Sequence, residues 1–150
     1  MNRKIGVMQG RLLPKYLNRY QAHPVKYWKD EFPIAFQLGL DSIEFILDYN
    51  NAEENPLLNL KGLEEIQNIE KSSKVKVRSV CADYFMEATI HSKDSTIVDK
   101  SLNILERLIK NASLMNITDI IIPCVDHSGW QNLKEINNFV YSIFDFVLED

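Results

Sequence analysis

The sequence lacks a long hydrophobic run, an excess of positive charge and a glycine-rich phosphate loop. Its N-terminal segment, MNRKIGVMQGR, has only a very short apolar stretch, so neither a signal peptide nor a membrane span is predicted. The formal net charge is -4, and duplex nucleic acid is not an expected partner because phosphate binding needs a basic surface. The five glycines form neither a G-x-G-x-x-G nor a P-loop pattern, which removes the usual signals for a nucleotide site.

Cysteine is scarce as well, with Cys81 and Cys124 as the only two. Each stands at the end of an apolar run of the kind that forms a buried strand, and their spacing matches no zinc or redox motif. Buried free thiols suit a reducing compartment better than a disulfide between the two residues. We therefore expect a cytoplasmic protein.

What the sequence does contain is one pattern repeated four times. Runs rich in β-branched and apolar residues, typical of buried strands, occupy residues 4–8, 42–47, 75–81 and 117–123. Apolar residues at helical spacing follow each run, over residues 28–38, 60–69, 97–112 and 136–147. Pro33 has to lie in the first turn of its helix. The alternation predicts an α/β fold of four consecutive βα units with parallel strands.

The predicted connections are unequal in length. Tight loops lead into the strands, whereas long loops leave them, at residues 9–24, 48–59, 82–94 and 124–131. In parallel α/β folds, ligands bind outside the carboxyl ends of the strands. We therefore expect the functional residues on these long loops.

Four βα units are half of what a closed barrel contains, since a (βα)8 barrel needs eight units and typically about 250 residues. We expect residues 1–150 to form one domain, the N-terminal half of a TIM barrel. Such a half exposes strand edges and an inner face, which favours a homo-oligomer or a missing second half. A small flavodoxin-like sheet is the alternative, although Gln9-Gly10-Arg11 follows the first strand where that fold places a phosphate loop or an acidic pair.

Six segments resemble the xylose-isomerase-like TIM barrels, and within them the bacterial sugar phosphate isomerase/epimerase group. They are IGVMQGRLLP at 5–14, RYQAHP at 19–24, EFPIAFQLGLDSIEFILD at 31–48, NPL at 55–57, SVCADYFM at 79–86 and IPCVD at 122–126. The similarity covers the whole chain but only the first half of such a barrel. The apurinic endonucleases of the same superfamily carry a histidine after the third strand, where this chain has Cys81-Ala82-Asp83.

The resemblance implies an isomerase or epimerase acting on a small-molecule sugar or sugar phosphate. It also implies a divalent metal, Mn, Co, Zn or Mg, that polarises the carbonyl and hydroxyl of a ketose. In relatives of this kind the metal ligands and catalytic residues lie on strands five to eight. No metal ligand is therefore expected in this chain, which we predict to be inactive alone.

Candidate substrate-binding residues lie in or just after the predicted strands. They are Gln9, Arg11, Glu44, Asp83, Tyr84, Asp126 and His127. Carboxylates accept hydrogen bonds from hydroxyl groups, an amide both donates and accepts, and a guanidinium holds phosphate. A carboxylate inside an apolar strand, as at Glu44, needs a partner or a ligand because its burial alone is costly.

Each candidate also has a structural interpretation. Glu44 can pair with a buried cation, Arg11 can brace loop 9–24, and the two aspartates can cap loop amides. Tyr84 can pack at the barrel rim, and a loop histidine such as His127 is commonly a surface residue. Three functions therefore remain open, namely half of an isomerase, a half-barrel binding or assembly module without catalysis of its own, and a small flavodoxin-like ligand-binding domain.

Overall fold

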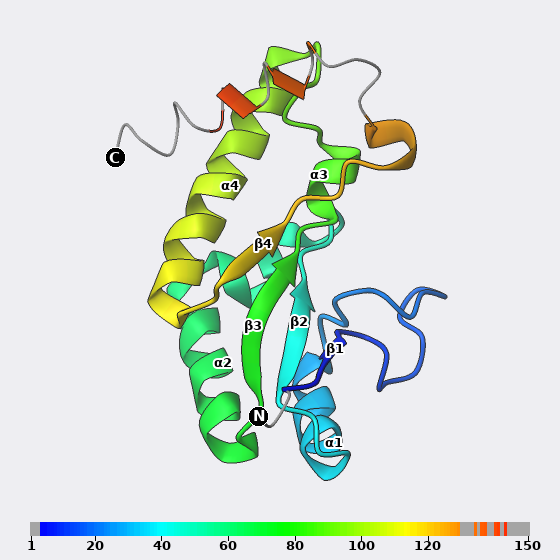
Figure 1. The fold of residues 1–150 in the computed structure, drawn as a ribbon, viewed down its shortest axis with the longest axis vertical. Helices are drawn as coiled ribbons and strands as arrows, with labels where there is room; N and C mark the ends of the chain where they lie inside the picture. Colours follow the sequence, from blue (N-terminus) through cyan, green and yellow to red (C-terminus); the bar gives the residue numbers. More distant parts are fainter. Residues whose placement is uncertain (1–3, 130–133, 135, 138–139, 142, 144–150) are drawn as a thin grey trace.

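The computed structural model describes residues 4–129, 134, 136, 137, 140, 141 and 143. Four parallel strands form one sheet in the order β1-β2-β3-β4 (Figure 1). The strands are β1 (Gly6–Met8), β2 (Ser42–Ile46), β3 (Lys76–Cys81) and β4 (Asp119–Ile121). Each lies inside the run that predicted it, so the α/β fold with four parallel strands is confirmed.

Three longer helices alternate with the strands, namely α1 (Glu31–Gln37), α2 (Leu60–Ser73) and α4 (Ser95–Met115). The long loops contain further short elements, which are α3 (Tyr84–Glu87), η2 (Ala52–Glu54), η3 (Pro56–Leu58) and η4 (Asp126–Ser128), and η1 (Trp28–Asp30) directly precedes α1. Most of the helix predicted over 136–147 lies outside the described residues. None of the described helices is long and apolar enough to cross a membrane.

Local chemistry sets the helix ends. The Asn59 side chain accepts a hydrogen bond from the Gly62 amide at 2.8 Å, and Asp94 accepts one from Thr96 at 2.9 Å, so both residues are N-caps. Helices α2 and α4 end at Lys74 and Asn116, which adopt the left-handed conformation of a C-cap. Pro33 is the third residue of α1, which confirms its predicted place in the first turn.

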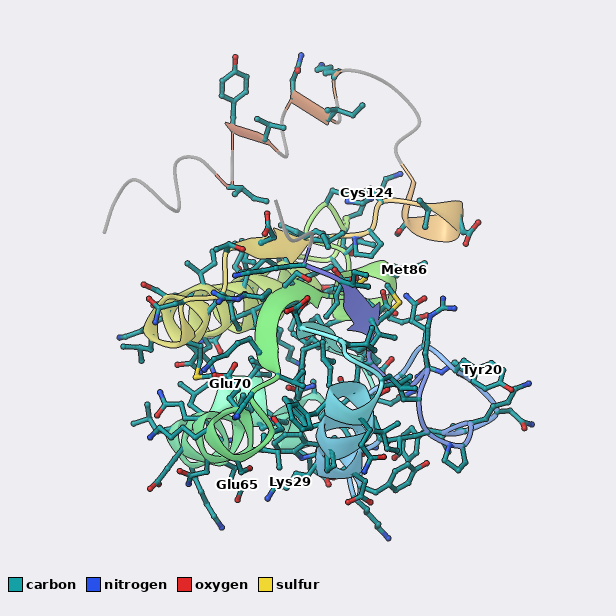
Figure 2. All side chains as sticks on the ribbon, turned by 60° about the horizontal axis from the view of Figure 1, so that its bottom comes forward. Tyr20, Lys29, Glu65, Glu70, Met86 and Cys124 are labelled. Carbon is teal, nitrogen blue, oxygen red and sulfur yellow. The ribbon has the colours of Figure 1, made fainter. Side chains whose placement is uncertain are left out.

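The three longer helices cover one face of the sheet. A single buried cluster joins side chains of α1, α2 and α4 to the β2 and β3 residues Ile43, Phe45, Val77 and Val80. Figure 2 shows Lys29 and Glu65 beside each other in this helical layer, where their side chains form an ion pair at 2.9 Å. The chain thus builds its core between the sheet and the helices.

The opposite face of the sheet carries a different set of side chains. Met8, Glu44, Ser79 and Asp119 are joined in register across the four strands. The register shifts between Ile43 and Glu44. Because of this shift Ser79 lies opposite Glu44, whereas strict alternation along β3 would place Ser79 on the other face. Glu44 Oε2 accepts a hydrogen bond from the Ser79 hydroxyl at 2.7 Å.

Candidate functional site

Two aspartates occupy equivalent positions beyond neighbouring strands. Ile46 pairs with Cys81 at the ends of β2 and β3, and Asp48 and Asp83 each follow two residues later. Both aspartates line one cavity of about 540 Å³. Its other lining residues are Arg19, Tyr49, Asn50, Met86 and Glu87. The carboxyl edge of the sheet, where the sequence predicted a site, therefore holds a polar cavity.

Asp48 joins the cavity to the loop that follows β1. Its Oδ1 accepts a hydrogen bond from Arg19 Nη2 at 2.8 Å, and its Oδ2 accepts one from the His23 backbone N–H at 2.8 Å. Only 9% of the Asp48 side chain is exposed, whereas 46% of the Arg19 side chain is. The carboxylate is thus largely occupied with protein donors, and the guanidinium next to it reaches solvent.

Asp83 is held by neutral donors instead. The Cys81 thiol donates to Oδ1 at 3.2 Å and the Gln21 amide donates to Oδ2 at 3.4 Å. Burial raises the pKa of Asp83 above its ordinary value, and the negative charge of Asp48 adds to this, while the hydrogen bonds from Cys81 and Gln21 and the charge of Arg19 oppose it. Asp83 is therefore a carboxylate in the cavity wall without an ion-pair partner among the described residues.

The cysteine behind Asp83 is not a nucleophile. Burial raises the pKa of the Cys81 thiol to about 12, and the hydrogen bond to Asp83 and the charges of the surrounding carboxylates act in the same direction. The thiolate is the reactive form of cysteine, so Cys81 stays protonated at neutral pH. Its contribution here is the hydrogen bond that orients Asp83.

One aromatic ring, that of Tyr49, lines the cavity. The Tyr49 and Tyr84 rings lie 5.3 Å apart, and the Tyr84 ring also contacts Phe85 edge-on. Tyr49 is about half exposed. Tyr84 is buried, and it lines a separate cavity beside Glu53 and Asp99. Of the two tyrosines, only Tyr49 therefore offers a ring surface to this cavity.

Glu31, a fully buried carboxylate at the start of α1, anchors the loop after β1. It accepts hydrogen bonds from the Gly10 amide at 2.9 Å and the Leu12 amide at 3.1 Å. Gly10 has φ +85°, and a Cβ there would overlap the backbone of Tyr20 and Ala22. The turn therefore requires glycine, and it directs the chain toward Arg19 and the cavity.

Gln9 is fully buried and does not line the cavity. Its Oε1 accepts hydrogen bonds from the Ile46 amide at 2.9 Å and from His23 Nδ1 at 3.1 Å. The predicted inward row of Val7 and Gln9 instead faces the helices, since Val7 packs against the core there. Gln9 is thus a structural residue that ties the end of β1 to the end of β2.

The other predicted residues are dispersed. Glu44 lies on the opposite sheet face and is bonded to Ser79. Arg11 is exposed near the start of loop 9–24, and Asp126 is exposed on η4. The backbone of His127 lies in η4, but its side chain is outside what the structure describes. Of the seven predicted residues, only Asp83 lines the cavity of about 540 Å³.

The sequence reasoning missed six of the residues that line the cavity, namely Arg19, Asp48, Tyr49, Asn50, Met86 and Glu87. Asp48 carried a usable signal, because it follows its strand at the same distance as Asp83. Arg19 carried none, because its position depends on how loop 9–24 folds back to β2. That path is set by the hydrogen bonds of Asp48 described above.

A divalent metal would need several oxygen, nitrogen or sulfur ligands at one point. Within the described part of the chain, no three His, Cys, Asp or Glu side chains are grouped in that way. Asp48 is also bonded to Arg19 and to the His23 amide. These residues do not fit a resident metal ion by themselves.

Fold and cavity together define a parallel α/β domain with strands in chain order and a polar site at their carboxyl edge. No protein-family model matches the chain, and no curated protein is significantly similar to it in sequence. The family resemblance therefore depends on the sequence segments alone.

Proposed function

We propose that this chain forms the substrate-binding half of a metal-dependent sugar or sugar-phosphate isomerase or epimerase whose complete fold is a (βα)8 barrel. One observation carries the proposal: Asp48 and Asp83, at equivalent positions beyond neighbouring parallel strands, line one cavity. In βα barrels the loops at this edge form the active site.

The strand order supports the barrel. A doubly wound sheet reverses its strand order at a switch point, whereas β1 to β4 follow one another in chain order. A barrel also has its helices on the outside only, and α1, α2 and α4 pack on one face. Both features favour a half-barrel over the flavodoxin-like alternative.

The residues of the cavity suit a polyhydroxyl ligand. Asp83 can accept hydrogen bonds from hydroxyl groups, Asn50 can donate and accept them, and the Tyr49 ring offers an apolar surface to the C–H face of a sugar. In this proposal the metal and the proton-transferring groups come from residues outside this chain. The chain itself binds and orients the substrate.

The proposal is tested by titrating the protein with a neutral ketohexose, D-fructose, while recording backbone amide NMR spectra. We expect saturable shifts at Tyr49, Asn50 and Asp83. Asp83→Ala should weaken binding by about tenfold or more, since a hydrogen bond to a charged group contributes roughly 1.5–3 kcal/mol.

The matched control is Asp99→Ala, which removes an exposed carboxylate that lines a different cavity. This variant should bind as the wild type does. Shifts that do not saturate, or that map to the Asp99 region, would refute a sugar site at Asp83. Turnover of the ketose by this chain alone would contradict the assignment of catalysis to other residues.

A second function, assembly without catalysis, is favoured by the sheet itself. β1 and β4 are its two edges, and Ile121 on β4 is 43% exposed. Exposed edges and apolar strand residues promote pairing with another chain. Sedimentation equilibrium over a wide concentration range checks this, with Ile121→Asp as the disrupting variant. A monomer at every concentration would contradict the assembly function.

A further inference from the structure

Negatively charged side chains outnumber positively charged ones in the lining of the cavity. Its lining contains three carboxylates, Asp48, Asp83 and Glu87, against one guanidinium, that of Arg19. Arg19 and Asp48 form an ion pair at 2.8 Å and largely compensate each other. Asp83 accepts hydrogen bonds from a thiol and an amide, which are both neutral, so its carboxylate leaves the wall negative even if Glu87 is compensated elsewhere.

We infer that this cavity takes a neutral polyhydroxyl sugar and discriminates against its phosphate ester. The inference rests on the proposed function and narrows its substrate class. A phosphate group in the cavity would face the Asp83 carboxylate at short range, where like charges repel strongly because a partly enclosed site screens them poorly. Hydroxyl groups have no such penalty and find acceptors on the same wall.

Arg19 is the one cation among the lining residues, and its charge is already largely compensated. Its Nη2 is bonded to Asp48 Oδ1 at 2.8 Å, so a phosphate that approached the remaining N–H groups of the guanidinium would also face the Asp48 carboxylate. Asp48 holds the His23 backbone N–H as well, which fixes this carboxylate in the wall. Arg19 therefore offsets the repulsion from Asp83 only in part.

Among the described residues, one group of cations that could hold a phosphate lies far from this cavity. Lys71, Lys76 and Arg78 line a cavity of about 390 Å³ with Glu70 at the amino end of β3. The length of β3 places this cavity about 20 Å from Asp83, which is farther than a hexose phosphate spans. Figure 2 shows Glu70 and Met86, which lines the site, apart from each other on different elements.

The experiment compares D-fructose with D-fructose 6-phosphate as ligands of the same protein, by NMR titration at low ionic strength. We expect the phosphate ester to bind about tenfold more weakly or worse. Raising the salt concentration should narrow this difference, because salt screens the repulsion.

Asp83→Asn keeps the size of the side chain and removes its charge, so the ratio of the two dissociation constants should fall toward one. Asp99→Asn changes the net charge equally at an exposed position outside the site, and the ratio should stay at its wild-type value. The ratio is the readout because Asp83→Asn also weakens hydrogen bonding to both ligands.

The outcomes distinguish a failure of the charge discrimination from a failure of the proposed sugar site. If the phosphate ester binds as tightly as fructose or more tightly, the charge discrimination is wrong and the sugar site stands. If the ratio is the same in Asp83→Asn and in Asp99→Asn, the discrimination does not originate in the cavity. If neither ligand binds at the Asp83 site, the proposed function itself is wrong.

Discussion

Lowering the pH should destabilise the fold through His23. The effect should begin well above the pH at which the ring becomes protonated in the folded protein. The ring is buried against Trp28 and Phe45, with centroid distances of 6.3 and 5.4 Å. Burial lowers the pKa of His23 from 6.5 to about 3. The native ring is neutral at pH 7, with its Nδ1–H donating to Gln9 Oε1, because that oxygen already accepts the Ile46 N–H.

The direction of this pH effect follows from the pKa of His23 in the unfolded chain and its pKa in the folded protein. The unfolded chain binds a proton at His23 below about pH 6.5, while the folded protein resists protonation down to about pH 3. Stability is therefore fully present above pH 6.5 and is lost as the pH falls through this window. Proton linkage for these two pKa values gives a loss of roughly 2 kcal/mol at pH 5 and roughly 3 kcal/mol at pH 4.

The assay is urea unfolding between pH 7.5 and 4 on the wild type and on His23→Phe. The substitution keeps a planar ring against Trp28 and Phe45, and it leaves the backbone hydrogen bond of residue 23 to Asp48 in place. Carboxylate protonation is common to both proteins, so the difference between their free energies of unfolding isolates the histidine. That difference should shift in favour of the variant by roughly 2 kcal/mol between pH 7.5 and pH 5.

Two parallel stability curves would refute the reasoning. If His23→Phe does not fold, the ring of the wild type still decides the matter through its own NMR titration. A His23 ring that titrates near 6.5 in the folded protein would contradict the burial argument.

Three further substitutions should separate interior from surface interactions, each measured by urea unfolding at pH 7. Gly62→Ala places a Cβ on the backbone of Pro56 and should cost about 1–3 kcal/mol, because the first turn of α2 cannot move away without repacking. Asn111→Ala removes a 2.7 Å hydrogen bond to the Leu57 carbonyl and should cost about 1–3 kcal/mol, since a buried acceptor is left unpaired. Glu53→Ala breaks the ion pair with Arg107 from its exposed side, since 70% of the Glu53 side chain is exposed, and should cost less, about 0–1 kcal/mol. Equal losses for Asn111 and Glu53 would contradict this ranking.

The alternating pattern of apolar runs was sufficient to predict the strands, because a parallel strand covered by helices needs consecutive β-branched residues and a following amphipathic segment. The observed strands are shorter than the predicted runs because pairing stops where the neighbouring strand ends. Residues 4 and 5, for example, precede the first paired residue, Gly6. The helix within loop 82–94 was not predicted, since four residues give too short a pattern for periodicity to register.

The site was harder to predict because sequence parity groups residues by face without saying which face is covered. Val7 and Gln9 share a face as expected, but the helical layer packs on it and buries Gln9. Glu44 lies on the other face, and the register shift beside it brings Ser79 opposite its carboxylate. These placements depend on tertiary packing, which no pattern within one strand encodes.

Asp48 explains why the scaffold and the cavity cannot be altered independently. Its carboxylate holds the His23 amide, and through it the loop whose start is held by Glu31, while the same carboxylate neutralises Arg19 in the cavity wall. A substitution at Asp48 would therefore change stability and ligand binding together, and a loss of binding would not reveal its cause. Asp83 accepts hydrogen bonds from two neutral side chains, those of Cys81 and Gln21, so its substitution acts mainly on the charge and the acceptors of the wall. For that reason variants of Asp83, rather than of Asp48, are the ones that test which ligand this site binds.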